Sequence, residues 1–271
     1  MLLQIIYIVD LSMQLVWIIL QLLVSIFLLV KMFKTKQYNI LPLILFFLIN
    51  SIRLFIYVFT PFILIYLILI QIPNIMLLIF IKTTFYRKRK SPFKFFLIIL
   101  VIVRSIDFWI RLQYGITVPM RFSLSESHIV FYYYILFSIS ISFLFSHLWL
   151  GIVSIRYYKS IESIEIEPWI KKRYQIIGIA SITYSLSIIL YYFFPHNVAV
   201  ELTLTNPNPT LAILFLLTTF FTIFYSICMF VAWVMPHKVK AFLNRNFQII
   251  SDKEYEENEL LELIKKELNN K

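Results

Sequence analysis

Seven long stretches of the chain are almost entirely apolar, and short polar connections separate them. About 20 residues cross the hydrocarbon core of a bilayer as an α-helix, which is close to the length of each stretch. The pattern predicts an all-α membrane protein: a seven-transmembrane helix bundle over residues 1–235, followed by a tail over residues 236–271. The predicted spans are 11–32, 40–60, 62–81, 94–113, 129–155, 174–194 and 210–235.

The fourth stretch carries ionisable side chains, which is unusual for a segment that spans a membrane. Arg104 and Asp107 are three residues apart, and Asp107 and Arg111 are four apart, so all lie on one face of a helix. A charge in hydrocarbon costs roughly 2.5–3.5 kcal/mol on insertion scales, so such a face turns toward the bundle interior or a wet cavity. We expect the other spans to surround it.

Polar residues lie at a similar depth in the neighbouring spans. They form either a structural network that holds the helices together or the lining of a ligand pocket that opens outward. Because arginines outnumber Asp107 here, one deep arginine needs an anionic partner. We predict an ion pair between Arg53 and Asp107 beside Asn50 or Arg104, with Arg111 extending to the outer interface. The candidate ligand-binding residues are Asn50, Arg53, Gln71, Asn74, Arg104, Asp107, Trp109 and Tyr184.

Basic residues gather at alternate connections. Apart from Arg53, Arg104, Arg111 and Arg121, every Lys and Arg lies around the first, third or fifth connection or in the tail. Cytoplasmic segments carry the Lys and Arg excess of membrane proteins, so we predict an outside N-terminus and an inside C-terminus in a multi-pass protein of the cell membrane. The net charge of +11 then reflects the anionic headgroups of the lipid bilayer and not a nucleic acid partner.

Composition argues against several other classes. The chain is 61% hydrophobic, more than a soluble domain can bury, and its one cysteine, Cys228, allows no intrachain disulfide and no multi-cysteine metal site. The histidines are scattered, and no hydrolase or metalloprotease motif is present. Residues 210–235 contain no lysine that could hold retinal. We expect no enzymatic activity, no metal and no cofactor.

Two local features interrupt the helical pattern. Pro73 lies in the middle of the third span and is expected to kink it. Apolar and polar or small residues alternate over 198–205, a period that indicates a short extended segment outside the membrane. This segment either caps the bundle or is a threonine-rich loop.

The tail is predicted to form two helices. Pro236 opens the first, whose stripe of Val239, Phe242, Leu243 and Phe247 indicates an interfacial helix on the inner leaflet. Residues 251–254 have the spacing of a capping box and begin the second, which runs to 268. Its apolar stripe is a candidate surface for a cytoplasmic signalling or scaffold protein, or for the bundle's own loops. The stripe consists of Leu260, Leu261, Ile264 and Leu268.

The predicted outline, seven spans followed by an amphipathic helix, resembles the topology of serpentine receptors. The local motifs of that family are missing: residues 81–86 contain no acidic–Arg–aromatic triplet, and residues 230–236 contain no Asn-Pro-x-x-Tyr. Coupling to a heterotrimeric G protein is therefore unsupported. The ending from Trp233 through Arg245 looks like that of uncharacterised archaeal multi-span proteins.

The resemblance and the excess arginine together suggest a receptor-like or sensory protein. It would bind a small anionic or amphipathic ligand in the outer half of the bundle and signal to a cytoplasmic partner. One alternative is a small-solute transporter of three-plus-one-plus-three type, since aromatic residues precede Pro61 and Pro195 at the ends of the second and sixth spans. The other is a membrane anchor or scaffold subunit that has no ligand of its own.

Overall fold

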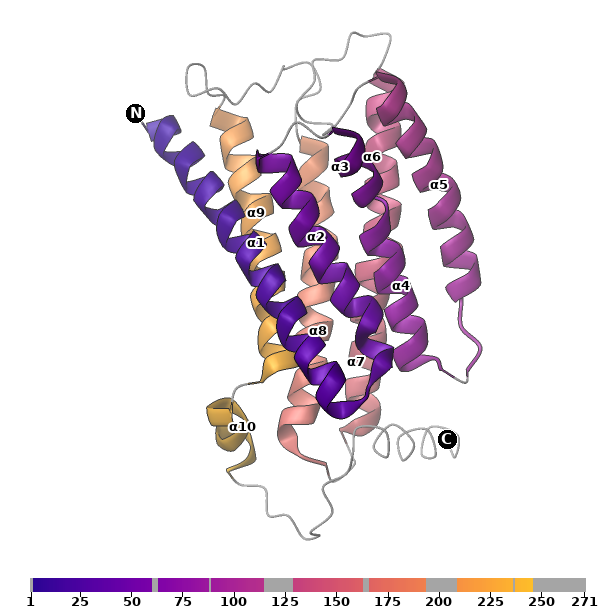
Figure 1. The fold of residues 1–271 in the computed structure, drawn as a ribbon, viewed down its shortest axis with the longest axis vertical. Helices are drawn as coiled ribbons and strands as arrows, with labels where there is room; N and C mark the ends of the chain where they lie inside the picture. The colour runs from indigo at the N-terminus through magenta and orange to yellow at the C-terminus, as the bar shows by residue number, and fades with distance from the viewer. Residues whose placement is uncertain are drawn as a thin grey trace.

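The computed structural model describes residues 2–59, 63–87, 89–114, 129–162, 166–193, 209–235 and 237–245. Every regular element among these residues is a helix, and the long helices lie side by side in one bundle (Figure 1). The elements are α1 (Leu2–Thr35), the 3₁₀ turn η1 (Tyr38–Ile40), α2 (Leu41–Phe59), α3 (Ile63–Leu69), α4 (Ile72–Phe85), α5 (Phe93–Tyr114), α6 (Ile129–Phe143), the π-helical segment η4 (Leu144–Leu148), α7 (Trp149–Ile161), α8 (Pro168–Leu186), the 3₁₀ segment η5 (Ser187–Phe193), α9 (Pro209–Val234) and α10 (His237–Asn244).

Six helical segments of the described part are long and apolar enough to cross a membrane, which indicates a multi-pass membrane protein. They coincide with six of the predicted spans. The remaining prediction, 94–113, corresponds to α5, which is 22 residues long but carries Lys94, Arg104, Asp107 and Arg111. The six segments are Leu11–Thr35, Tyr38–Ile56, Leu64–Phe85, Ile129–Ile161, Pro168–Phe193 and Ile213–Val234.

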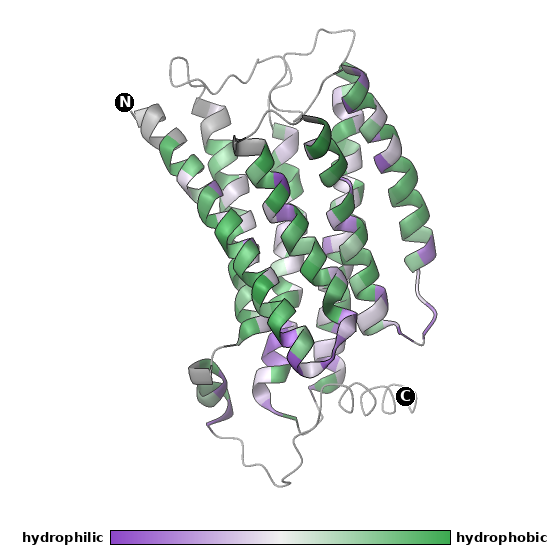
Figure 2. Cartoon of the chain, viewed as in Figure 1, coloured by the Kyte–Doolittle hydropathy of each residue, from purple (hydrophilic) through white to green (hydrophobic). Residues whose placement is uncertain are grey.

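The outer walls of the bundle are apolar. Large side chains such as Ile19 of α1, Ile98 of α5 and Phe220 of α9 are exposed. Figure 2 shows hydrophobic residues along the length of the helices and hydrophilic residues concentrated at the end where α10 lies. Contiguous apolar surface of this extent is typical of protein that contacts lipid and not water.

Close helix packing forms the interior. Helix α1 packs against α2 and α9, α8 packs against α7 and α9, and buried apolar side chains fill the space between them. Helices α7 and α8 approach closely at Gly151 and Gly178, where a Cβ on Gly151 would lie 3.1 Å from the Gly178 carbonyl oxygen. Small residues permit such close approach of backbones in membrane bundles.

The predicted disruption of the third span at Pro73 is confirmed, as a break between α3 and α4 at Ile70 and Gln71. Proline has no N–H to donate to the preceding turn, and its ring clashes with the carbonyl four residues earlier. The Gln71 N–H instead donates to the Ile68 carbonyl in a shorter turn, at 3.2 Å. Ile70 therefore lies between two helices, where a side chain of another helix can reach its carbonyl oxygen.

The helices of the first, fifth and sixth spans extend beyond their predicted bounds. Helix α1 begins at Leu2 and ends at Thr35, whereas the predicted span is 11–32. The fifth span continues to Ile161 and contains the π-helical segment η4, which an apolar pattern alone does not reveal. The sixth begins earlier than predicted, at Pro168, because proline suits the first turn of a helix, where its missing N–H would have no partner. It ends in the 3₁₀ segment η5.

Helix α10 lies where the sequence predicts the first tail helix, and its Val239 and Phe242 side chains are exposed. Its polar residues meet the start of α8. Asn244 Nδ2 donates to Glu167 Oε2 at 3.1 Å, and Lys240 Nζ lies 4.2 Å from the centre of the Trp169 ring. Phe247, the predicted extended segment 198–205 and the second tail helix, with its candidate partner-binding residues Leu260, Leu261, Ile264 and Leu268, lie outside the described residues.

Candidate functional site

Helix α5 presents two opposite faces. Arg104, Asp107 and Arg111 are 4%, 0% and 0% exposed, so the charged face lies inside the protein. Their spacing of three and four residues puts them on successive turns of one face, as the sequence predicts. The other face consists of exposed apolar residues: Phe95, Ile98, Ile102, Ile106 and Trp109.

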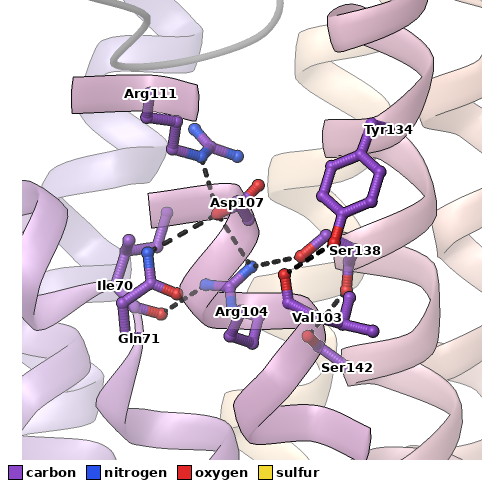
Figure 3. Close-up of polar contacts among 9 residues, drawn as sticks. All are labelled: Ile70, Gln71, Val103, Arg104, Asp107, Arg111, Tyr134, Ser138 and Ser142. Atoms are coloured by element: carbon purple, nitrogen blue, oxygen red, sulfur yellow. Dashed lines mark hydrogen bonds and ion pairs between the residues drawn. The ribbon is translucent and has the colours of Figure 1, made fainter. Parts of the chain in front are cut away.

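Asp107 is the centre of the charged face (Figure 3). Its Oδ2 accepts a hydrogen bond from Arg111 Nε at 2.9 Å, lies 3.6 Å from Arg104 Nη1, and accepts a long hydrogen bond from Gln71 Nε2 at 3.5 Å. Its Oδ1 is buried and accepts no hydrogen bond within the described chain. All contacts of this carboxylate are thus made by one oxygen, and the Arg111 contact is the shortest.

Two predictions about these charges are wrong. Asp107 pairs with Arg111 and Arg104 of its own helix, and the described residues show no ion pair between Asp107 and Arg53. Arg111 does not extend to the outer interface but is fully buried. Neighbours one turn apart on a helix are already placed to meet, whereas a contact with α2 requires a particular helix packing.

Arg104 connects α5 to two other parts of the bundle. Its Nη2 donates to the Ile70 carbonyl at 2.7 Å, at the break between α3 and α4, and its Nη1 donates to Ser138 Oγ of α6 at 3.5 Å. Tyr134 of α6 adds a hydrogen bond to the Val103 carbonyl at 3.1 Å. The broken backbone at Ile70 therefore gains a hydrogen-bond donor from the buried arginine, as non-helical backbone at membrane depth requires.

Arg53 of α2 has no counterion among the described residues. It is half-buried, and no ion pair or hydrogen bond joins it to the described residues; its Nε is fully buried. It lies within electrostatic range of Arg104 and of Tyr184. Sequence reasoning predicts an arginine in excess, and in the structure that arginine is Arg53.

The other candidate residues do not join this cluster. Asn50 is buried and donates to the Phe46 carbonyl of its own helix at 3.0 Å. Asn74 accepts from Ser146 Oγ at 3.0 Å, and Tyr184 stacks on Tyr225 with ring centres 4.7 Å apart. Trp109 is 59% exposed on the apolar face of α5. Gln71, Arg104 and Asp107 are the predicted residues that the structure brings into contact.

Sequence reasoning missed two partners in the cluster. The Ile70 carbonyl could not be named from the sequence, because the break at Pro73 exposes a backbone atom and not a characteristic side chain. Ser138 had a weak signal: Ser138, Ser142 and Ser146 recur every four residues along one face, and all are buried. That spacing is typical of a polar stripe facing other helices.

His147 lies in the π-helical segment η4 and is enclosed by aromatic rings. The ring centres of Tyr184 and Tyr225 lie 4.8 Å and 5.1 Å from that of the imidazole, and Phe46 and Phe143 complete the cluster. His147 thus occupies a packing position, and its buried Nδ1 has no hydrogen-bond partner among the described residues. In the described chain, no three His, Cys, Asp or Glu residues group as a metal site would require.

The chemistry that this arrangement offers is recognition of an anion. Two guanidinium groups flank one carboxylate, and a third guanidinium lies within electrostatic range, so positive charge exceeds negative charge in a buried environment. Guanidinium groups bind carboxylates and phosphates through paired hydrogen bonds. Comparisons of the chain with protein-family models, curated proteins and solved structures find no match, so the functional argument rests on this geometry.

Proposed function

We propose that the protein is a receptor-like or sensory membrane protein that binds a small anionic or amphipathic ligand in the outer half of its bundle. The observation that carries the proposal is Arg53, a half-buried guanidinium without a counterion among the described residues, within electrostatic range of the Arg104–Asp107–Arg111 cluster. An unneutralised charge at membrane depth is costly and marks functional sites. A bound oxyanion would supply the missing negative charge.

The proposal includes a seventh span, α5. Its apolar face, with Ile98, Ile102 and Trp109, suits lipid, and its charged face is buried against the bundle. In Figure 1, α5 runs beside α4 and α6, which also contact it. A helix with its charges turned inward can cross a bilayer despite a charge content that exceeds that of an ordinary span.

The proposed orientation places the N-terminus outside and the C-terminus inside. The α1–α2 and α4–α5 connections and α10 lie at one end of the bundle in Figure 1. Lys34, Lys82 and Lys240 belong to the helix ends and the tail helix of this region. An excess of Lys and Arg at one end supports a cytoplasmic location for it. The charged cluster then lies nearer the outer surface.

A signal requires that the ligand bind one arrangement of the helices more tightly than another. Arg104 contacts the Ile70 carbonyl and Ser138, so an anion that attracts Arg104 changes contacts between α5, the α3–α4 break and α6. We propose that the resulting shift reaches the cytoplasmic connections and the tail. A cytoplasmic signalling or scaffold protein would read it there, and the stripe at 260–268 stays a prediction for its contact surface.

Ligand binding can be tested on the purified full chain in an uncharged detergent. A ligand that binds the folded state stabilises it against unfolding. Sodium acetate is therefore expected to raise the thermal unfolding temperature above that in sodium chloride of equal ionic strength. Arg53→Gln should abolish this difference. Arg156→Gln, at an exposed position of α7, is the matched control and should retain it. An equal response of Arg53→Gln and wild type would contradict the proposal.

A transporter is the second candidate, and the α3–α4 break favours it. Discontinuous membrane helices often form the substrate sites of secondary transporters, and here the break contacts the buried Arg104. Protein reconstituted in vesicles distinguishes the two candidates. Saturable uptake of radiolabelled acetate would establish a transporter, whereas binding without uptake would support the receptor.

A further inference from the structure

The two ion pairs of Asp107 differ in length, and this difference bears on how a ligand could enter the cluster. Arg111 Nε lies 2.9 Å from Asp107 Oδ2, at the distance of a good charge-assisted hydrogen bond, whereas Arg104 Nη1 lies 3.6 Å from the same oxygen. Asp107 would keep a close counterion if Arg104 moved away. Arg104 is therefore the exchangeable partner of the pair.

Arg104 is also incompletely satisfied where it stands. Its Nε is buried and has no hydrogen-bond partner among the described residues, and the same holds for Asp107 Oδ1. Its Nη1 is shared between the long contact to Asp107 and a long hydrogen bond to Ser138 Oγ. The one short hydrogen bond of this guanidinium goes to the Ile70 carbonyl, at 2.7 Å.

We infer that Asp107 is a built-in competitor of the ligand: a ligand carboxylate binds between Arg53 and Arg104 by taking Arg104 from Asp107. This inference rests on the proposed function and adds the ligand class and the residue that sets the affinity. The class is a carboxylate, because the cluster already holds one against Arg104. After the exchange Arg111 pairs with Asp107, and the single negative charge of the ligand lies between Arg104 and Arg53. Each negative charge then has a guanidinium partner, and the excess positive charge of the three arginines falls from two to one.

The exchange makes an unusual prediction for Asp107→Asn. A residue that merely holds the fold together should weaken ligand binding when it is replaced. Replacement of a competitor should instead strengthen ligand binding, because Arg104 then has no internal carboxylate to give up. We expect the dissociation constant of acetate, measured by thermal stabilisation of the full chain, to fall at least tenfold in Asp107→Asn.

A double-mutant cycle separates competition from a simple loss of negative charge nearby. If Asp107 competes for Arg104, the gain from Asp107→Asn should disappear in an Arg104→Gln background. A gain of equal size without Arg104 would overturn the inference, as would unchanged or weaker binding in Asp107→Asn alone. If Asp107→Asn does not fold, Asp107→Glu is the alternative test. Its longer side chain brings the carboxylate closer to Arg104, so acetate should bind at least threefold more weakly. Unchanged affinity of Asp107→Glu for acetate would overturn the inference.

The same titrations distinguish failure of this inference from failure of the proposed function. The proposed function fails, and the inference with it, if acetate stabilises neither wild type nor Asp107→Asn beyond chloride, or if Arg53→Gln retains the wild-type response. The inference alone fails if wild type and Arg53→Gln behave as proposed but Asp107→Asn gains nothing. Binding of acetate to Asp107→Asn at concentrations too low to affect wild type supports both.

Discussion

Two residues that directly follow helices have a left-handed backbone conformation, and one is exposed whereas the other is buried. Lys36 follows α1 with φ of 53°, and Met235 follows α9 with φ of 35°. Residues with a Cβ avoid this region because the Cβ approaches the following carbonyl oxygen, and glycine is the usual residue at this position. Lys36 is exposed, whereas Met235 is 2% exposed in the packed interior. The two positions should therefore respond differently to glycine.

Lys36→Gly is expected to raise the free energy of unfolding by about 1 kcal/mol, because it relieves the backbone and removes little contact. Unfolding by titration with SDS in mixed micelles measures the change. Lys34→Gly, in the last helical turn of α1, is the matched control and should lower stability by roughly 1 kcal/mol. An equal decrease in the free energy of unfolding for Lys36→Gly and Lys34→Gly would show that the backbone conformation of Lys36 does not destabilise the protein.

Met235→Gly is expected to lower the free energy of unfolding despite the same backbone relief. Truncating a buried large apolar side chain costs roughly 2–5 kcal/mol, which exceeds the strain. The same SDS titration gives the sign directly. Stabilisation of Met235→Gly would mean that packing at the α9–α10 junction contributes less than its burial indicates.

At the scale of helices, the α7–α8 crossing depends on the backbone approach at Gly151. A Cβ there would lie 2.6 Å from Ile182 Cγ1, and it would also meet backbone, at 3.0 Å from the Ile182 nitrogen and 3.1 Å from the Gly178 carbonyl oxygen. A Cβ on Gly178 would mainly meet the side chain of Ile155, at 2.5 Å from Cδ1 and 2.6 Å from Cγ1, whereas its one backbone contact, with the Gly151 carbonyl oxygen, is longer, at 3.3 Å. Backbone cannot move aside as a side chain can, so the two glycines are not equivalent.

Gly151→Ala should therefore destabilise the protein by roughly 1–3 kcal/mol through overpacking, although alanine is the better helix former. Gly178→Ala should cost less, and Ile155→Ala should recover part of that cost because it removes the clashing atoms. SDS titration of the single and double variants checks the order. A larger loss for Gly178→Ala than for Gly151→Ala would contradict the packing described for this crossing.

At the scale of the whole molecule, the prediction is topology. In a Cys228→Ser background, single cysteines at Ser123 and Thr205 should react with a membrane-impermeant maleimide added to intact cells. Cysteines at Ser91 and Ser163 should react only after the cells are permeabilised, because positively charged connections stay in the cytoplasm. Labelling of Ser91→Cys in intact cells would overturn the proposed topology, and equal labelling of Ser91→Cys and Ser123→Cys would show that α5 does not cross the membrane.

The sequence by itself determined the helical architecture. Apolar runs of membrane-spanning length predict where helices lie because a backbone in lipid must satisfy its own hydrogen bonds, and the structure bears this out for six spans. Pro73 likewise predicted the break between α3 and α4, since a missing N–H acts locally. The shared face of Arg104, Asp107 and Arg111 follows from helix periodicity alone.

Only the tertiary structure decided which polar groups meet. The closest counterion of Asp107 is Arg111, the short hydrogen bond of Arg104 goes to the Ile70 carbonyl, and the described residues show no ion pair between Arg53 and Asp107. The position of a residue within its predicted span gives its depth in the membrane. It does not give the rotation of the helix about its axis, which depends on packing against neighbouring helices. Arg53 and Asp107 therefore matched in depth and in charge and still did not pair.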